Sequence, residues 1–447
     1  RDWSSDVCSS DLCIVSRALH SVGKSTRLVK VEERPGNAGV DRFSTLDGRR
    51  VSWKAGRKSA PSGDVSPGGG EQPPSSPTFR VIAMNHRDVF EELFVLEMAN
   101  NHWGSVERGL EIIRQHSRIV RFNNVRAAIK LQFRDVDNFI HKDFRDRQDI
   151  RYIKKTLDTR MSKDGYATLI AAVKKASCIP MSTPFDEASV DLCVELGIPI
   201  IKIASSDMND WVLIEKIATT KRPVIVSTGG TSQKDLDDLV SFFERRNIPL
   251  AINHCVSLYP TEENELELNQ IDYLKNRYPG HVIGLSTHEH ADWQASMLIA
   301  YAKGARTFER HIDIDAGGVP VSPYCSLPEQ ADTWLKAYAR AKTMCGGSAD
   351  QKRRPPNREI EYLDALVRGV YAKRDLPEGH VLTHETMHDD LYLAIPLQKG
   401  QISCRELMSG ETLQRAVSKD HPITIDAIDS AYAYTEGLKE LITRRGL

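Results

Sequence analysis

Residues 178–206 read CIPMSTPFDEASVDLCVELGIPIIKIASS and contain a complete repeat of strand, helix and strand. The apolar or β-branched runs Cys178–Pro184 and Ile200–Ser206 are typical of strands buried on both faces, as in parallel sheets. Between them, Ala188–Leu196 places its apolar residues on one side of a helix. A strand, a helix and a second strand in this order predict a parallel βαβ unit.

The same alternation continues in both directions along the chain. Eight apolar runs alternate with mostly amphipathic helical stretches over roughly 250 residues, which predicts an α/β fold, a (β/α)8 or TIM barrel. A doubly wound open sheet is the alternative, although no GxGxxG turn supports it. Besides the two runs above, the predicted strands are Phe94–Ala99, Ala127–Phe133, Pro223–Gly229, Leu250–Val256, His281–His288 and Arg306–Ile312.

The two ends of the chain differ from this repeat. Residues 1–78 begin with RDWSSDVCSSDL, which lacks any strand or helix period and resembles a translated sequencing adapter, and later become rich in Gly, Pro and Ser. We therefore expect residues 1–78 to be disordered or non-native and the catalytic barrel to span 79–350. A charged, proline-containing linker (351–364) then leads to a small, mostly β domain (365–430) and a tail (431–447).

Composition excludes several classes of function. The formal net charge is −1, which argues against a protein that coats nucleic acid or binds a membrane surface through charge. No stretch approaches the ~20 apolar residues of a membrane-spanning helix. The 8 cysteines are scattered and form no CxxC pair, which favours reduced thiols and a cytoplasmic protein over a disulfide framework or a zinc site.

Two histidines end neighbouring predicted strands, at the face where (β/α)8 barrels build active sites. His288 closes GLSTH and His311 closes FERH, so their imidazoles could converge on one divalent cation. Two imidazoles with open coordination positions suit a Lewis-acid site for Mn²⁺ or a similar metal. The alternative is a pair of ordinary polar residues at strand ends.

Ammonium and hydroxyl groups gather at the same predicted rim. A phosphate ester needs this mixture of compensating charge and short hydrogen-bond donors. The hydroxyls could instead cap the following helices, and either lysine could form a Schiff base, as in an aldolase. Two lysines within apolar strands are harder to explain structurally, because an unpaired buried ammonium is costly. The candidate anion-binding residues are Lys130, Ser182, Thr183, Lys202, Ser205 and Ser227.

Two carboxylates complete the set of candidates. Glu97 and Asp207 lie at the ends of the first and fourth predicted strands and could orient a water or exchange protons with a substrate. A salt bridge to Lys130 or Lys202 is the equally weighted alternative.

These residues together resemble the sialic acid (N-acetylneuraminate) synthase family, over roughly residues 94–429. The matching text is LEMANNHWGS, AIKLQ, STPFD, IKIASSD, IVSTGG, INHCVSLYP, GLSTH and FERH, in the family's order and at barrel spacing. The later segment VYAKRDLPEGHVLT is similar to the antifreeze-like (SAF) domain that such synthases carry.

The resemblance implies a synthase that condenses phosphoenolpyruvate with an open-chain N-acetylamino sugar and releases phosphate by C–O cleavage. It implies a divalent metal, Mn²⁺ first and Mg²⁺ or Co²⁺ as alternatives, and a domain-swapped homodimer. By this resemblance His288 and His311 hold the metal, and the six anion-binding candidates contact phosphoenolpyruvate. The catalytic residues are Glu97 and Asp207. Around the substrates lie Asn101, Gln132 and Tyr259.

Several positions depart from the family pattern. Thr287 and Asp207 replace the usual aspartate of GLSDH and glutamate of SGE, while Ser322 and Ile395 stand where a sugar-contacting aspartate and arginine are common. The sugar half is therefore less well matched than the phosphoenolpyruvate half, and a legionaminic or pseudaminic acid precursor is an alternative to N-acetylmannosamine. A Kdo-8-phosphate-type synthase and a non-catalytic, sugar-binding descendant of the fold are the competing hypotheses for the function.

Overall fold

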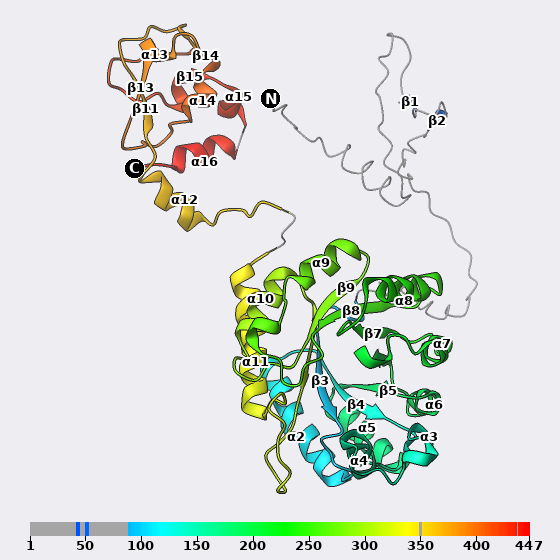
Figure 1. Cartoon of the computed structure of the whole chain (residues 1–447). Helices are drawn as coiled ribbons and strands as arrows, with labels where there is room; N and C mark the ends of the chain where they lie inside the picture. The colour runs from blue at the N-terminus through cyan, green and yellow to red at the C-terminus, as the bar shows by residue number, and fades with distance from the viewer. Residues whose placement is uncertain (1–41, 45–49, 53–87, 348–350, 436) are drawn as a thin grey trace, which may run out of the picture. The chain divides into compact units, whose positions relative to one another are not determined.

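The computed structural model describes residues 42–44, 50–52, 88–347, 351–435 and 437–447 (Figure 1). Near the N-terminus it places two short antiparallel strands, β1 (Arg42–Ser44) and β2 (Arg50–Ser52). The rest of residues 1–78 lies outside the described residues, and with it the prediction that this segment is disordered or non-native.

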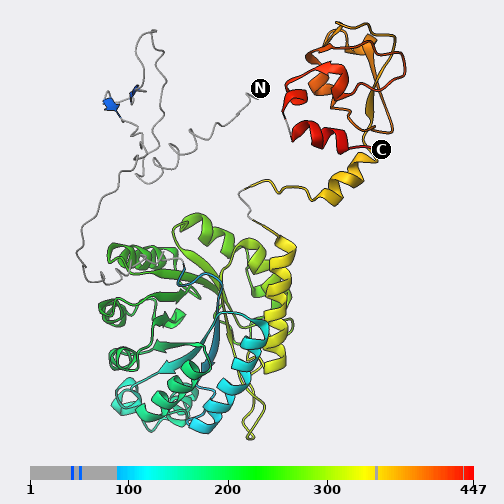
Figure 2. The same cartoon turned by 180° about the vertical axis from the view of Figure 1, so that it is seen from behind.

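Eight parallel strands form a closed barrel in the order β10-β3-β4-β5-β6-β7-β8-β9. The helices surround the strands, as the views from both sides show (Figures 1 and 2). The predicted (β/α)8 fold is thus confirmed, and each predicted strand lies within a few residues of an observed one. The barrel strands are β3 (Leu93–Ala99), β4 (Ala127–Phe133), β5 (Ile179–Pro184), β6 (Ile200–Ile203), β7 (Val224–Ser227), β8 (Leu250–Cys255), β9 (Val282–Thr287) and β10 (Thr307–His311).

Five of the helices between the strands, α2, α5, α6, α7 and α8, begin at a side chain that accepts a capping hydrogen bond. In α6, for example, the Asp186 carboxylate accepts a hydrogen bond from the Ser189 amide, and such caps typically contribute about 1 kcal/mol. The segment between β4 and α5 holds three short helices that the sequence patterns did not predict. The barrel helices are α2 (Val106–Asn123), α3 (Val136–Phe139), η1 (Lys142–Phe144), α4 (Arg151–Asp158), α5 (Lys163–Lys175), α6 (Glu187–Glu195), η2 (Ser205–Asp207), α7 (Trp211–Thr219), α8 (Gln233–Arg245), η3 (Glu263–Glu265), α9 (Gln270–Arg277), α10 (Ala295–Lys303) and α11 (Pro328–Cys345).

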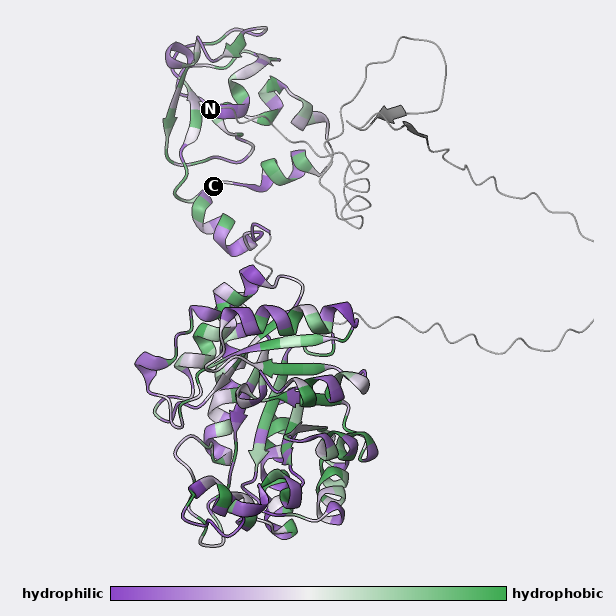
Figure 3. Ribbon diagram, turned by 45° about the vertical axis from the view of Figure 1, so that its right-hand side comes forward, coloured by the Kyte–Doolittle hydropathy of each residue, from purple (hydrophilic) through white to green (hydrophobic). Residues whose placement is uncertain are grey.

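The barrel has two apolar layers because neighbouring residues of a strand point to opposite faces. One face packs against the helices, as when Phe94 on β3 contacts Trp334 and Tyr338 of α11 edge to face, with ring centroids 5.4 and 4.8 Å apart. The other face fills the barrel interior with a separate cluster that includes Val95 and Ala128. Hydrophobic colour accordingly concentrates on the strands, while the helices carry both colours (Figure 3).

The C-terminal region has a hydrophobic cluster of its own, which includes Val370, Leu382 and Ile425. Two small antiparallel sheets, β11-β13 and β12-β14-β15, frame this cluster. Among the described residues, no helix combines the length and apolar character needed to cross a membrane. The elements of this region are α12 (Asn357–Asp364), β11 (Gly369–Ala372), β12 (Val381–Thr383), α13 (Met387–Asp390), β13 (Leu391–Ala394), α14 (Cys404–Leu407), β14 (Ser409–Leu413), η4 (Ile425–Ala427), β15 (Ile428–Asp429), α15 (Ala431–Tyr434) and α16 (Leu438–Arg444).

Candidate active site

The inward face of the barrel changes from apolar to polar within two residues. On β3, Val95 belongs to the interior apolar cluster, and Glu97, two residues later, points to the same side. Four further strands repeat this step at the same end of the barrel. The pairs are Ala128 and Lys130, Met181 and Thr183, Ile200 and Lys202, and Ile225 and Ser227. The alternation of each strand therefore brings these five predicted residues to one side of the sheet.

Four charged side chains meet inside this end of the barrel. Lys202 donates to both carboxylate oxygens of Glu309 at 3.0 Å, and Lys130 forms an ion pair with Glu97 and lies 3.3 Å from Glu309. All four side chains are at most 5% exposed, so each buried charge requires an opposite charge beside it. The predicted salt-bridge alternative thus holds for Glu97, while Lys202 pairs with a residue that the sequence patterns did not predict.

Burial and pairing shift the pKa values of this cluster in opposite directions. Burial lowers the pKa of Lys130 to about 7, and the like charge of Lys202 acts in the same direction. Burial would raise the pKa of Glu309, but the two neighbouring ammonium groups outweigh it and lower that pKa overall. The cluster therefore holds an ionised Glu309 beside a lysine whose charge is sensitive to whatever binds next to it.

The candidate hydroxyls differ in their hydrogen-bond partners and in the face of the barrel to which they point. Thr183 accepts a hydrogen bond from Lys130 at 2.9 Å, and Ser205 accepts one from the Gly229 amide at 3.0 Å. The buried Ser227 hydroxyl has no hydrogen-bond partner among the residues that the structure describes. Ser182 pairs in register with residues whose side chains face the helices, so it points away from the interior that Thr183 faces.

These hydroxyls do not serve as the helix caps that were their alternative explanation. The capping hydrogen bonds of α6, α7 and α8 are accepted by Asp186, Asp210 and Ser232. The inward-facing hydroxyls thus remain available to a ligand, and within the described part of the chain the buried Ser227 hydroxyl has no acceptor, so a ligand oxygen could supply one.

The imidazoles of His288 and His311 lie side by side, with ring centroids 5.3 Å apart. His288 Nδ1 is 2.9 Å from the Val256 carbonyl, which only accepts, so Nδ1 carries the proton and Nε2 keeps its lone pair. Burial lowers the pKa of His288 to about 4. Burial, together with the nearby ammonium groups of Lys130 and Lys202, lowers the pKa of His311 far below its usual value. Both rings are therefore neutral at pH 7.

The donor chemistry of two neutral imidazoles, each with a free ring nitrogen, fits a divalent metal. Within the described residues, no group of three or more His, Cys, Asp or Glu side chains is arranged to hold a metal. A metal here would consequently have two protein ligands, and water or substrate oxygens would complete its coordination.

Aromatic side chains stand over the two histidines. Tyr259 lies 4.0 Å from the His288 ring and 5.2 Å from Tyr324, centroid to centroid, and Tyr324 lies 5.2 Å from His311. Tyr259 was a predicted substrate contact, whereas Tyr324 follows β10 in a segment without a regular pattern. The four rings form one wall of the site beside the charged cluster.

The remaining predicted residues lie at the same rim. Burial raises the pKa of Asp207 to about 6, and the Ser206 hydroxyl donates to its carboxylate at 2.9 Å. Gln132 accepts a hydrogen bond from Arg134 at 3.1 Å. The amide nitrogen of Asn101 donates to the Ile312 carbonyl at 2.8 Å, so this side chain secures the chain that follows His311.

Glu309 and Tyr324 are the site residues that the sequence patterns missed. For Glu309 a signal existed, because it stands two residues before His311 in FERH and an inward-facing His311 implies an inward-facing Glu309. For Tyr324 the sequence holds no comparable signal, since it lies outside any strand.

Comparison with known proteins matches this chain to enzymes of nonulosonic acid synthesis. N-acetylneuraminate-9-phosphate synthase of Drosophila melanogaster is 29% identical over 335 residues, which are 72% of this chain and 84% of that protein. N,N'-diacetyllegionaminic acid synthase of Campylobacter jejuni is 25% identical over 303 residues, 65% of this chain and 87% of that protein.

A solved structure and a family model complete the comparison. The crystal structure of spore coat polysaccharide biosynthesis protein E from Chromobacterium violaceum superposes with a TM-score of 0.72 at 36% identity, covering 76% of this chain and 100% of that one. The model of the NeuB family matches residues 123–347. Since that match spans half of the 447 residues and includes Lys130, Lys202 and Glu309 together with both histidines, the chain belongs to the NeuB family.

Proposed function

We propose that the protein is a nonulosonate (sialic-acid-type) synthase, which condenses phosphoenolpyruvate with an open-chain N-acetylamino sugar and releases phosphate by C–O cleavage. The observation that carries the proposal is the pair of buried ammonium groups, Lys130 and Lys202, at the barrel end where two neutral imidazoles also meet. The two ammonium groups suit an anionic substrate, and the two imidazoles suit a metal that activates an aldehyde. The named synthases among its relatives support the same reaction class.

Phosphoenolpyruvate is proposed to bind beside the two lysines. Lys130 and Lys202 supply positive charge, and the hydroxyls of Thr183, Ser205 and Ser227 supply short donors to phosphate or carboxylate oxygens. A phosphate oxygen would give the buried Ser227 hydroxyl the acceptor that none of the described residues supplies. Ser182 faces the helices, so its hydroxyl is not proposed to contact phosphoenolpyruvate.

His288 and His311 are proposed to hold Mn²⁺, with Mg²⁺ or Co²⁺ as alternatives. When bound, such an ion supplies Lewis-acid polarisation of the sugar's aldehyde oxygen. The side chains themselves set the distance between that aldehyde and phosphoenolpyruvate. Holding two reactants in register is worth on the order of 7–11 kcal/mol in favourable cases.

The proposed reaction forms a C–C bond and a C–O bond to water, and it breaks the C–O bond to phosphate. C3 of phosphoenolpyruvate bonds to the aldehyde carbon, the aldehyde oxygen gains a proton, and water adds at C2 as it loses one. The C2–O bond to phosphate then breaks while the new C2 hydroxyl gives its proton to the departing phosphate, which leaves a 2-keto acid and inorganic phosphate. Asp207, with a pKa of about 6, is proposed to exchange the water's proton, and Glu97 to keep Lys130 charged beside the substrate.

The sugar is proposed to be a legionaminic or pseudaminic acid precursor rather than N-acetylmannosamine. Ser322 and Ile395 replace an aspartate and an arginine that commonly contact the sugar in sialic acid synthases. We further propose that the protein works as a cytoplasmic, domain-swapped homodimer, whose C-terminal antifreeze-like domain covers the partner's site.

Phosphate release tests this proposal. The protein is incubated with phosphoenolpyruvate and Mn²⁺ across a panel of 2-acetamido and 2,4-diacetamido sugars, beside a His288→Ala control. We expect release with one class of sugar and its loss in the variant or after chelation of the metal. If folded, metal-loaded protein releases no phosphate with any sugar of the panel, the proposal is contradicted, and a Kdo-type substrate or a non-catalytic descendant is favoured.

A further inference from the structure

A buried ion pair lies directly next to both histidines in the chain. Glu289 follows His288, and Arg310 precedes His311. The Glu289 carboxylate and Arg310 Nη1 are 2.9 Å apart, and the two side chains are 5% and 1% exposed. Because Glu309 and His311 face the barrel interior, Arg310 between them faces the other way. The pair is therefore not part of the substrate-facing cluster.

Arg310 joins the two histidine-bearing segments. Its Nη2 donates to the Glu289 carbonyl at 2.5 Å, and its Nε donates to the Ser326 hydroxyl. The Ser326 amide in turn donates to the His311 carbonyl at 2.8 Å. One guanidinium thus links the residue after His288 to the residue that holds the backbone of His311.

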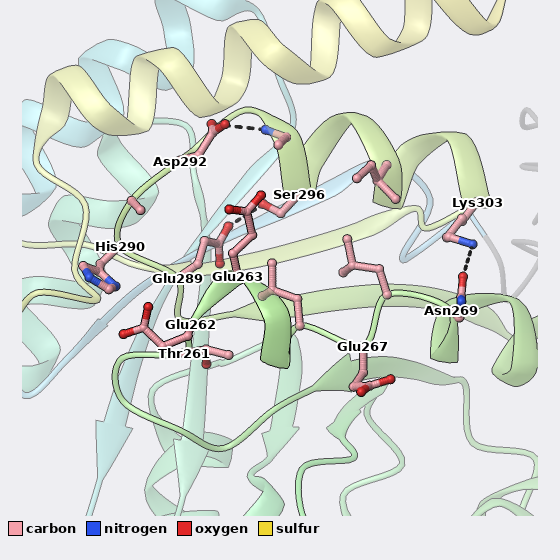
Figure 4. A pocket seen from close by; sticks show the side chains of 15 residues that line it. Thr261, Glu262, Glu263, Glu267, Asn269, Glu289, His290, Asp292, Ser296 and Lys303 are labelled. Carbon is pink, nitrogen blue, oxygen red and sulfur yellow. Dashed lines mark hydrogen bonds between the residues drawn. The ribbon is translucent and has the colours of Figure 1, made fainter.

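Glu289 is held in place from several sides. Its carboxylate accepts hydrogen bonds from the hydroxyls of Thr287 and Ser296, which leaves it little freedom to rotate. Glu289 and Ser296 also line a pocket of about 450 Å³ between the segments that follow β8 and β9 (Figure 4). Because Thr287, Ser296 and Arg310 engage both carboxylate oxygens, we assign Glu289 a role in holding Arg310 and not in binding a ligand of that pocket.

We infer that Arg310 and Glu289 are positioning residues, which set the spacing of the His288 and His311 imidazoles and so the geometry of the proposed metal site. The inference rests on the proposed function, because it requires metal binding by these rings. A site with two protein ligands has no third ligand to compensate for an error in their spacing. Side chains that orient metal ligands typically change metal affinity by 10–100-fold when they are lost.

A double substitution separates positioning from simple stability. Removing one partner leaves a buried unpaired charge and destabilises the fold, whereas Arg310→Met together with Glu289→Leu removes both charges and can preserve it. We expect this double variant to keep its thermal midpoint, while its Kd for Mn²⁺, measured by electron paramagnetic resonance, rises about 10–100-fold. The hyperfine coupling between the Mn²⁺ electron spin and the imidazole nitrogens should weaken in parallel.

The matched control is Arg306→Met. Arg306 stands just before β10, at the end away from His311, and forms an ion pair with Glu91. Its substitution should leave the Mn²⁺ affinity unchanged. A folded double variant with wild-type Mn²⁺ affinity and nitrogen coupling would overturn the inference. If the double variant does not fold, Arg310→Lys decides, because it keeps the charge but loses the fork of contacts. We expect a several-fold weaker Mn²⁺ affinity for it, and an unchanged one overturns the inference.

Failure of the proposed function would look different. Wild-type protein that binds no Mn²⁺, although phosphoenolpyruvate still raises its thermal midpoint, overturns the metal site and this inference together. Wild-type protein that binds Mn²⁺ with imidazole coupling but releases no phosphate contradicts the proposed reaction alone, and the affinity comparison still decides the role of Arg310 and Glu289.

Discussion

Burial raises the pKa of Asp207 to about 6, although the Ser206 hydroxyl and the charges of Arg134 and Lys202 lower it. A carboxyl group whose pKa is higher in the folded protein than in the unfolded chain costs stability once it ionises. The cost is absent below the ordinary value of 3.8, grows as the pH rises from there to about 6, and is complete above it. A pKa near neutrality is also what proton exchange at physiological pH requires.

Asp207→Asn should therefore affect stability and activity in opposite directions. At pH 8 we expect the variant to be more stable than wild type by roughly 1–2 kcal/mol, after allowance for solvent screening, and this gain should vanish near pH 4. Phosphate release should fall by about 10²-fold or more. Chemical denaturation at both pH values and steady-state kinetics measure the two effects, and a variant that is less stable at pH 8 would refute the assignment.

At the scale of single elements, the loop after β7 brings backbone and hydroxyls close together. A Cβ on Gly229 would lie 2.0 Å from the Ser257 hydroxyl and 2.9 Å from the Ser205 hydroxyl. The absence of a side chain thus lets the Gly229 amide donate to Ser205 and leaves both hydroxyls beside the rim.

Gly229→Ala should displace these hydroxyls and weaken phosphoenolpyruvate binding. A lost hydrogen bond to a charged group is worth about 1.5–3 kcal/mol, so we expect the Kd, measured by calorimetry, to rise about 10-fold or more. Gly280→Ala is the matched control, because a Cβ there meets no atom within 4 Å. Equal affinity of the two variants would show that the loop after β7 does not contribute to the anion site.

At the scale of the whole chain, the C-terminal region has the features of a domain that folds by itself. Leu382, Leu407 and Ile425 are at most 1% exposed within its own apolar cluster. The buried Asp390 carboxylate accepts hydrogen bonds from Arg374 at 2.6 Å and from His380 at 2.7 Å, so its charge is compensated within the same region.

Residues 357–447, produced alone, should consequently fold. We expect a single cooperative thermal transition and a stability near the lower end of the usual 5–15 kcal/mol, because a small domain buries a smaller share of its surface. Circular dichroism and a dispersed amide spectrum by nuclear magnetic resonance measure this. An uncooperative melt would show that the region depends on the barrel for its structure.

The sequence by itself determined the fold class and the end of the barrel that carries the site. Strand formation and the polar residue that ends each strand are local features, so Lys130, Lys202, His288 and His311 could be recognised from short apolar runs. The same information did not predict the helices α3 and α4 between β4 and α5, because they lack a long amphipathic period.

The tertiary structure alone decided which side chains meet. Lys202 pairs with Glu309 across 107 positions of the chain, and Arg310 reaches Glu289 from the neighbouring strand. The outward direction of Ser182 likewise follows from its register with β4 and β6. The physical reason is that apolar periodicity specifies the faces of each strand, whereas charge pairing depends on the closure of the barrel, which brings strands distant in sequence together.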